Sequence, residues 1–541
     1  MFGKEFVTMR PILRGLLGGA MMAVAGALAA IPIAASALDT LPSTSPSPAT
    51  QRRLATAVAT TTATSPSTRP HPGFPATKPL TFGVHTFPIG VTVRGGSDGY
   101  VRISPDMRHY AYPQLDELGT MRVALDGVTT DWLIPSDLFR FAYSPDSKHY
   151  AFHTWEDGKG SVIFDGKEQG PFFIPMGDHG MPVFSPDSQN LAYMARSRSD
   201  TPVNGVTPAA DLLVVLNGKV LAPPAYRPNG ISPPFVFNPG NNQLTYVTCH
   251  FDQRGLPLQC NIVRDGVEGE RLPGTQIEEV AFSPDGKHIA YLGCMRVAST
   301  FNDGFYMDGK LVAASPCAKL EQCATLTYSP DGLHAAAHMY AADGRSGVLS
   351  VNGVIGRLLP PGDLGDKPVF SPDSRRIACI VRRSEKSGPI STRFFDTVVV
   401  DDVPQIECDH VESLGFSPDS KSVVYVGTKT GPKGVKTMSL MIDKNVADKA
   451  EEIVAPSYSP DGKYLAYLKR DGETWSIQVN GTSIPWAGML RGPIVWESPT
   501  HFRVVGFATV PRNEELRSFE YTRIEVDVSE GVGAAATAPG Q

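Results

Sequence analysis

A three-residue motif, Ser-Pro-Asp, recurs at nearly even spacing through most of this 541-residue chain. Intact copies begin at Ser104, Ser144, Ser185, Ser283, Ser329, Ser371, Ser417 and Ser459, and degenerate copies are Asn238-Pro239-Gly240 and Ser498-Pro499-Thr500. The steps between successive copies are 40, 41, 53, 45, 46, 42, 46, 42 and 39 residues. Because a repeat of fixed period builds one structural unit per copy, the chain is expected to fold as ten equivalent units.

The motif itself predicts the turn of a first β-hairpin. Pro presets φ at the second position, Asp can accept hydrogen bonds from neighbouring amides, and the Gly that follows in several copies accepts positive φ. An aromatic residue precedes the motif in eight of the ten copies, and alanine and then an aromatic residue usually occupy the seventh and eighth positions after the Ser, as in Ala290-Tyr291. Two short strands joined by a turn are therefore expected in each unit.

A second hairpin signal follows in each unit. Runs rich in β-forming residues end in Asp-Gly or Asn-Gly, whose residues tolerate the positive φ of a type I′ turn. These dipeptides occur at Asp126-Gly127, Asp165-Gly166, Asn217-Gly218, Asp265-Gly266, Asp308-Gly309, Asn352-Gly353 and Asn480-Gly481, with weaker copies at Asp401-Asp402 and Asp443-Lys444. Two hairpins per unit make four strands, and a period in the forties is the size of one four-stranded β-propeller blade.

The repeats also resemble a known family. The stretch Phe282-Ser-Pro-Asp-Gly-Lys-His-Ile-Ala-Tyr291 is similar to the WD-like β-propeller repeat of the periplasmic protein TolB and its relatives. The resemblance covers residues 80–528 and implies an all-β propeller of about ten four-stranded units. Those relatives that act in the Tol-Pal system carry a small α/β domain before the blades, which this chain replaces with other sequence, so their Pal-binding role is not carried over.

The number of rings is open at this level. Common propellers have four to eight blades, so ten units fit either one wide ring or two smaller rings. The segment from Leu80 to His85 resembles a spare strand, and the last unit ends near Val528. A front strand that completed the final unit would close a ring and cover both exposed strand edges.

The two ends of the chain differ in composition from the repeats. Residues 1–37 combine early basic residues, an apolar run and Ala35-Ser36-Ala37, which predicts a secretory signal peptide or, if uncleaved, an N-terminal membrane anchor. Residues 38–79, rich in Thr, Ser, Pro and Ala, are expected to be a disordered tether, and residues 529–541 a disordered tail. The repeat region, residues 80–528, is therefore expected to be extracytoplasmic, either periplasmic or secreted.

The composition and the motif content of the chain argue against several classes of function. The chain has 49 Lys and Arg against 55 Asp and Glu, a net charge of −6, which argues against a nucleic-acid partner. The pattern Gly-x-Ser-x-Gly occurs only as Gly95-Gly96-Ser97-Asp98-Gly99, and the repeats leave no room for the α/β-hydrolase domain in which this motif carries the nucleophile. No phosphate-binding Gly loop or His-Glu-x-x-His motif is present. No catalytic, cofactor-binding or metal-ligating residue is predicted, and no cofactor is expected. The Asp residues of the eight intact motifs are interpreted as turn residues, because so many copies cannot all be catalytic.

Histidines and cysteines offer further candidates. Four histidines each lie five residues after their motif Ser: His109, His149, His288 and His334. This position fits either a ring of ligands or an exposed site that tolerates polar residues. The second interpretation is preferred because Lys, Gln and Arg occupy or flank the same position in other units. Among the seven cysteines, two disulfides are expected in an exported chain. The pairs are Cys249 with Cys260 and Cys317 with Cys323, while Cys379 is expected to be a buried thiol and Cys294 and Cys408 lack a local partner.

The function that the sequence favours is an exported, non-enzymatic binding or scaffold protein of the periplasm or cell envelope. It would recognise a protein or glycan partner through propeller loops, with membrane contact only through an uncleaved N-terminal anchor. Five tryptophans are candidate contact residues, although each also fits packing between blades: Trp132, Trp155, Trp475, Trp486 and Trp496. The alternative is a propeller-fold hydrolase or lyase that acts on an extracytoplasmic glycan through scattered carboxylates.

Overall fold

A computed structural model describes most of the repeat region. The described residues are 61–64, 74, 79–91, 101–115, 120–134, 140–156, 159–172, 181–196, 212–221, 235–251, 257–271, 276–297, 300–314, 325–340, 346–361, 363–364, 367–386, 392–431, 434–510 and 518–530. The expected signal peptide and tail, apart from residues 529 and 530, lie outside them, as do the side chains of Cys249, Cys260 and Cys294 and the whole of Cys317 and Cys323.

Regular structure in the described residues consists of β-strands. The first half of the chain contains β1 (Thr61–Thr64), β2 (Leu80–Val91), β3 (Arg102–Ile103), β4 (Tyr110–Leu115), β5 (Met121–Leu125), β6 (Val128–Leu133), β7 (Phe141–Tyr143), β8 (Tyr150–Glu156), β9 (Lys159–Phe164), β10 (Lys167–Phe172), β11 (Val183–Phe184), β12 (Leu191–Arg196), β13 (Leu212–Leu216), β14 (Lys219–Val220), β15 (Phe235–Phe237), β16 (Leu244–Phe251), β17 (Pro257–Arg264), β18 (Val267–Arg271), β19 (Gln276–Phe282), β20 (Ile289–Val297), β21 (Thr300–Met307) and β22 (Lys310–Ala314). Within the described part of the chain, no helix has the length and apolar character needed to cross a bilayer.

The second half continues the same pattern of short strands. It contains β23 (Thr325–Tyr328), β24 (Ala335–Tyr340), β25 (Ser346–Val351), β26 (Val354–Pro361), β27 (Asp363–Leu364), β28 (Val369–Phe370), β29 (Ile377–Lys386), β30 (Thr392–Val400), β31 (Val403–Cys408), β32 (His410–Phe416), β33 (Val423–Thr430), β34 (Lys436–Ile442), β35 (Asn445–Ala450), β36 (Glu452–Tyr458), β37 (Leu465–Asp471), β38 (Thr474–Val479), β39 (Thr482–Trp486), β40 (Met489–Ser498), β41 (His501–Val510) and β42 (Ser518–Glu530).

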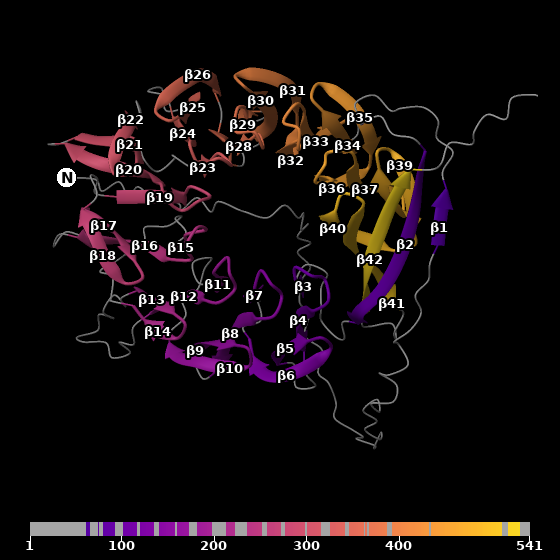
Figure 1. Cartoon of the computed structure of the whole chain (residues 1–541), viewed down its shortest axis with the longest axis horizontal. Coiled ribbons are helices and arrows are strands. Elements are labelled where there is room, and N and C mark those ends of the chain that lie inside the picture. Colours follow the sequence, from indigo (N-terminus) through magenta and orange to yellow (C-terminus); the bar gives the residue numbers. More distant parts are fainter. Residues whose placement is uncertain are drawn as a thin grey trace, which may run out of the picture. The chain divides into compact units, whose positions relative to one another are not determined.

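These strands form ten antiparallel sheets, one for each repeat, which we number as units 1 to 10 from Ser104 to Ser498. In most units four consecutive strands pair in chain order, as in β3-β4-β5-β6 or β32-β33-β34-β35, and the sequence colours of Figure 1 follow this order. In unit 7 the first strand is split into β27 and β28, which both pair with β29. The prediction of an all-β propeller of about ten four-stranded units is confirmed.

Both predicted turn types have the expected backbone. The residues of the Asp-Gly and Asn-Gly dipeptides have positive φ, for example 47° at Asp126 and 81° at Gly127, as type I′ turns require. In the eight intact motifs the fourth position also has positive φ, and it is Gly in three copies, Ser in four and Met in one: φ is 72° at Gly286, 63° at Ser374 and 56° at Met107. The sequence pattern predicts the glycines there, but it gives no expectation for the serines.

Each sheet packs its apolar faces against its two neighbours. Alanine at the seventh position lets the sheets approach closely, so Ala111, Ala151, Ala192, Ala290 and Ala466 have no exposed surface. Apolar clusters fill the interfaces between units 1 and 2, 2 and 3, 3 and 4, 5 and 6, 7 and 8, 8 and 9, and 9 and 10. Strand contacts join unit 4 to unit 5 and unit 6 to unit 7. Unit 10 packs on unit 1, where Phe507 and Tyr521 contact the cluster of Tyr110 and Tyr112.

Contact of the last unit with the first decides between the two alternatives for closure. Because every sheet has two packed neighbours and the succession returns to its start, the ten units form a single closed cycle instead of two smaller ones. The front strand completes the final sheet: β2 pairs with β42 over eleven residue pairs, from Leu80 with Glu530 to Val91 with Glu520. Figure 1 shows β2 beside β42, although the two are at opposite ends of the sequence.

One short strand lies within the segment expected to be a tether. Thr61–Thr64 forms β1, which pairs with the free edge of β2 and makes the last sheet five-stranded. Apart from these residues, Phe74 and Pro79, the segment 38–79 is outside the described residues. At the other end, β42 continues two residues past the expected boundary at Val528.

We expect the front strand to contribute to stability like a core element. Phe82 of β2 is 1% exposed and packs against units 9 and 10, so Phe82→Ala is expected to lower the free energy of unfolding by about 3–5 kcal/mol. His85, whose half-buried side chain faces the other way and pairs with Asp527, provides a control, since His85→Ala should cost less than about 1 kcal/mol. Guanidinium denaturation measures the free energy of unfolding of both variants. Equal effects of the two substitutions would contradict the pairing of β2 with the last sheet.

Candidate binding surface at the motif turns

The motif turn is held by the side chains of its own Ser and Asp. In all eight intact copies the Ser hydroxyl donates to the Asp carboxylate at 2.5–2.6 Å. The same hydroxyl oxygen accepts from the amide five residues after the Ser at 2.9–3.0 Å. The buried hydroxyl therefore both donates and accepts, and it adds to the two backbone hydrogen bonds that the same Ser makes within the turn.

The Asp of each intact motif has a structural role. Its Oδ1 also accepts from the amide two residues later, at 3.0–3.2 Å. Hydrogen bonds to the charged form favour that form: the hydroxyl of Ser144 lowers the pKa of Asp146 to about 2. The observed contacts agree with the sequence interpretation that these carboxylates are turn residues.

The second turn of each unit is tied to the motif turn. In units 1 to 9 the Asp or Asn at the dipeptide accepts, through Oδ1, from the amide six residues after the motif Ser at 2.8–3.0 Å. Both turns therefore lie at the same end of their sheet. We call this end of the ten sheets the turn face.

The four candidate histidines take part in the same contact. Nδ1 of His109, His149 and His288 lies 2.8, 2.6 and 2.9 Å from Oδ2 of the dipeptide Asp of its own unit. Nδ1 of His334 lies 2.7 Å from Nδ2 of Asn352. The structure thus places each histidine against its own turn and does not bring the four together as one ligand set. No group of His, Cys, Asp and Glu in the described residues has the arrangement of a metal site.

Successive motif turns are also linked to one another. The Ser at the fourth position, where φ is positive, accepts a hydrogen bond from the Asp amide of the preceding unit. These distances are 2.9 Å from Asp106 to Ser147, 3.0 Å from Asp146 to Ser188, 3.0 Å from Asp331 to Ser374 and 3.0 Å from Asp373 to Ser420. We call this contact the serine latch. The turn motif does not predict this contact, although Ser instead of Gly at the fourth position is the sequence feature that marks it.

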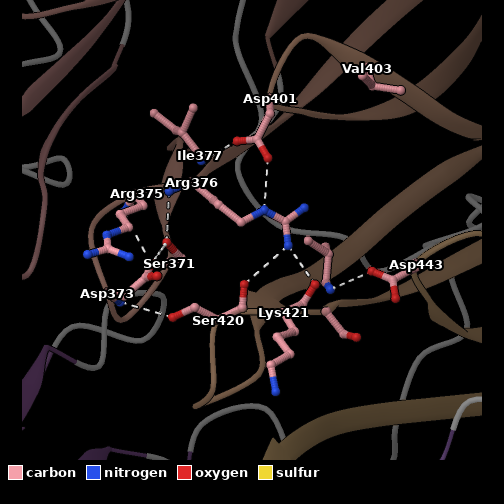
Figure 2. Close-up of polar contacts among 12 residues, drawn as sticks. Ser371, Asp373, Arg375, Arg376, Ile377, Asp401, Val403, Ser420, Lys421 and Asp443 are labelled. Carbon is pink, nitrogen blue, oxygen red and sulfur yellow. Dashed lines mark hydrogen bonds and ion pairs between the residues drawn. The ribbon is translucent and has the colours of Figure 1, made fainter.

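Unit 7 has a second link to unit 8 (Figure 2). Arg376, at the position of the histidines, donates from Nε to Asp401 at 2.8 Å. Its Nη1 donates to the carbonyl oxygens of Ser420 and Lys421 at 3.1 and 2.6 Å. Because the planar guanidinium reaches three acceptors, it joins both turns of unit 7 to the motif turn of unit 8.

Exposed cations follow the motif on the turn face. The position four residues after the Ser is basic in six of the eight intact copies: Arg108, Lys148, Lys287, Arg375, Lys421 and Lys463. In units 2, 5 and 8 the ammonium group lies 3.6, 3.0 and 3.2 Å from Oδ2 of the motif Asp. Such exposed pairs add little stability, so these side chains are available to a partner.

The tryptophan candidates pack between sheets. Trp475 is buried in the cluster between units 9 and 10, against which Trp486 and Trp496 also pack, and Trp132 packs between units 1 and 2. Trp496 also donates from Nε1 to the carbonyl oxygen of Ser457 at 3.2 Å. The side chain of Trp155 is outside the described residues. For the four described tryptophans the packing alternative is the one that the structure supports.

Two cysteines can be placed with their side chains. Cys379 is a buried thiol, as expected, and burial raises the pKa of this thiol to about 12. Cys408, for which no partner was expected, is also a free buried thiol. The backbones of Cys249 and Cys260 lie directly opposite each other on β16 and β17.

A second polar cluster lies away from the turn face, between units 7 and 8. The Asp396 carboxylate is fully buried and accepts two hydrogen bonds from Arg382, at 2.7 and 2.8 Å. It also lies 3.0 Å from Nδ1 of His410 and accepts from the amide of Val411 at 3.0 Å. Neither Asp396 nor His410 was a candidate, because residues on different strands of two units leave no spacing in the sequence.

The charged neighbours of Asp396 keep its carboxyl group ionised. Burial raises the pKa of Asp396, but the hydrogen bonds from Arg382 and His410 outweigh burial and bring it to about 2. The hydrogen bond to Asp396 in turn raises the pKa of His410. The carboxylate therefore stays ionised and orients an imidazole whose side chain is 53% exposed.

Comparisons with known proteins identify no family for this chain. No family model matches the chain, and no curated protein matches it. Among solved structures, a eukaryotic initiation factor aligns at 12% identity over 71% of this chain and 95% of its own, with a TM-score of 0.39. TolB from Acinetobacter baumannii aligns at 16% identity over 58% of this chain and 61% of its own, with a TM-score of 0.23. Oligogalacturonate lyase from Vibrio parahaemolyticus aligns at 11% identity over 71% and 97%, with a TM-score of 0.27.

At TM-scores below 0.5 these similarities carry no argument of their own. The assignment as a β-propeller rests on the ten sheets, their cyclic packing and the closure by β2. Membership of the TolB-like repeat family, in contrast, stays an expectation from the motifs.

The serine latch predicts a selective effect on one interface. Ser420→Gly keeps the positive φ but removes the acceptor of the Asp373 amide, so we expect a loss of about 1 kcal/mol in stability and faster hydrogen exchange at Asp373. Ser413→Gly is the matched control, since Ser413 also has positive φ and is exposed. Unchanged exchange at Asp373 in the first variant would show that the latch is not formed in solution.

The contact between Asp396 and His410 predicts that the pKa of His410 depends on the charge of Asp396. Asp396→Asn should lower the pKa of His410 and, because it breaks a buried ion pair, cost about 3–5 kcal/mol. In the unchanged protein the His410 contact stabilises the fold below pH 6.5, the ordinary pKa, and its contribution is lost as pH rises through the raised pKa. Histidine NMR titration and denaturation measure these effects. Glu407→Gln, at a half-exposed pair with Arg383, is the control and should cost less than about 1 kcal/mol.

Proposed function

We propose that the chain is an exported, non-enzymatic β-propeller protein that binds a partner in the periplasm or cell envelope through its turn face. The partner is a protein or a glycan. One observation carries the proposal: the repeated Asp and His residues are engaged in hydrogen bonds within their turns, while the positions beside them present exposed cations. A rigid array of exposed charges suits recognition of a surface.

The closed cycle supports this proposal. Turn side chains can recognise a surface only if their spacing is fixed, since ordering mobile groups on binding costs free energy. Here each turn is fixed internally by its Ser and Asp, and several turns are fixed to the next by the serine latch. Export is part of the proposal because of the N-terminal sequence, which lies outside the described residues.

Site-specific photo-cross-linking in the native envelope tests this function. A photoreactive amino acid at Lys148, on the turn face, is expected to capture one defined partner, while one at Glu385, near the end of β29 away from the turn face, should not. Cell fractionation of the same samples tests export. Recovery of the chain in the cytoplasm, or equal capture from both positions, would contradict the proposal.

The second candidate function is glycan cleavage, and the Asp396 cluster favours it. A buried carboxylate that orients an exposed imidazole is an arrangement used in general acid–base catalysis. A hydrolase or lyase would use the Nε2 atom of His410 as the base. Assay of the purified chain against a panel of envelope and plant-wall glycans tests this function; turnover that is lost in His410→Gln would replace the binding proposal.

A further inference from the structure

Unit 6 breaks the charge pattern of the turn face. Where six of the eight intact motifs carry Lys or Arg and one carries Gln189, unit 6 carries Leu333. Its second turn also begins with a neutral residue, Asn352, where units 1, 2, 4 and 5 have Asp. The unit thus loses charge at two positions that lie at the same end of one sheet.

Three aliphatic side chains are exposed around this break. Leu333 is 68% exposed, Val354 is 73% exposed, and Leu311 of unit 5 is 46% exposed. The contact of Asn352 with His334 holds the second turn against the motif turn, so Leu333 and Val354 lie at the same end of the sheet. We call Leu311, Leu333, Val354 and the neighbouring Asp331 the unit-6 patch.

The unit-6 patch crosses from one sheet to the next. The backbone of Gly353 packs so closely on unit 5 that a Cβ atom there would lie 2.2 Å from the carbonyl oxygen of Val312, the residue next to Leu311. Gly332 similarly lies against Ser283 and Pro284 of the unit-5 motif turn. Positive φ and close contact restrict the backbone of both turns, so the aliphatic side chains beside these turns are held in exposed positions.

The same substitution uncovers a carboxylate oxygen. Oδ1 of Asp331 is used by Ser329 and by the amide of Leu333, at 2.5 and 3.0 Å. In units 2, 5 and 8 the second oxygen pairs with the Lys that Leu333 replaces. Among the described residues no ion pair is formed by Asp331, and its side chain is exposed. Leu333, in place of Lys, therefore puts an exposed apolar side chain next to a carboxylate oxygen that is available to a partner.

We propose that the unit-6 patch docks a segment of a protein partner that combines aliphatic side chains with a Lys or Arg. The aliphatic groups would remove exposed apolar surface from water, at about 25 cal/mol per Å², and the cation would pair with Oδ2 of Asp331. Charge complementarity favours a protein over a glycan, because a neutral or acidic glycan supplies neither group. The inference rests on the proposed function and names the class of partner for one part of the turn face.

Selection of peptides on the intact chain tests the inference. A displayed library of random twelve-residue peptides, roughly the span of a short interface segment, is panned on the purified protein. Enriched peptides are expected to contain Leu, Ile or Val together with Lys or Arg. Leu333→Lys, which recreates the arrangement of units 2, 5 and 8, should weaken their binding by about tenfold or more, and Val354→Thr, which copies Thr482 of unit 9, should weaken it less.

Val128→Thr provides the matched control. Val128 follows the second turn of unit 1 in the same way as Val354 and is 65% exposed, so its substitution should leave peptide binding unchanged. Thermal unfolding of all variants verifies the fold. Absence of enrichment, enrichment of acidic or sugar-like ligands, or peptide binding that Leu333→Lys does not weaken would overturn the inference. Repeating the envelope cross-linking with Leu333→Lys separates the two proposals: capture that persists unchanged keeps the proposed function and rejects the patch.

Discussion

The hydrogen bond from the motif Ser hydroxyl to the Asp carboxylate is the contact on which the rest of this fold depends. It closes a tight turn at the start of eight of the ten sheets and leaves the hydroxyl oxygen to accept a hydrogen bond from the amide next to the second strand. Short first strands such as β3 and β28 have only two residues, so backbone pairing alone would hold them weakly. The side-chain contact adds hydrogen bonds to these short strands, and its repetition gives the eight units with an intact motif the same first turn.

This role explains why the most frequent acidic residues of the chain are poor candidates for chemistry. A carboxylate that is oriented by a hydroxyl and by an amide has one oxygen committed to the turn, and its histidine neighbour is committed to the second turn. Specific function is therefore to be sought where a unit departs from the common pattern. Unit 7 does so with Arg376 and the Asp396 cluster, and unit 6 does so with Leu333.

Closure adds a constraint that acts between units. Small alanines at the seventh position allow close packing of sheets, and the serine latch connects turns where the fourth residue is Ser. Where Gly stands at that position, as in units 5, 6 and 9, this acceptor is absent. Other polar contacts cross two of these interfaces: Nδ2 of Asn238 donates to the carbonyl oxygen of Gly286, and Lys469 pairs with Asp448. The last interface depends on β2, because without it unit 10 would expose an unpaired edge on β42.

From the sequence alone one can derive the number of units, four strands in each, the type of both turns and the completion of the last unit by the front strand. These features follow from local rules, since Pro, Gly, Asp and Asn act within a few residues of their own position. The same reasoning predicts that the repeated Asp and His residues are structural. It leaves open whether ten units make one ring or two, because both arrangements use the same local signals.

Tertiary structure decided the remaining features, since they depend on atoms that are distant in the chain. Contact of Tyr521 with Tyr110 establishes the single closed cycle, and Asp396 meets His410 only because neighbouring sheets pack. The unit-6 patch has the same origin: Leu333 has no distinguishing feature in the sequence, but the fold places it at the same end of the sheet as the exposed Val354, next to the turn that carries Asp331. Spacing along a chain carries no information about such contacts, because they are created when separate units come together in space.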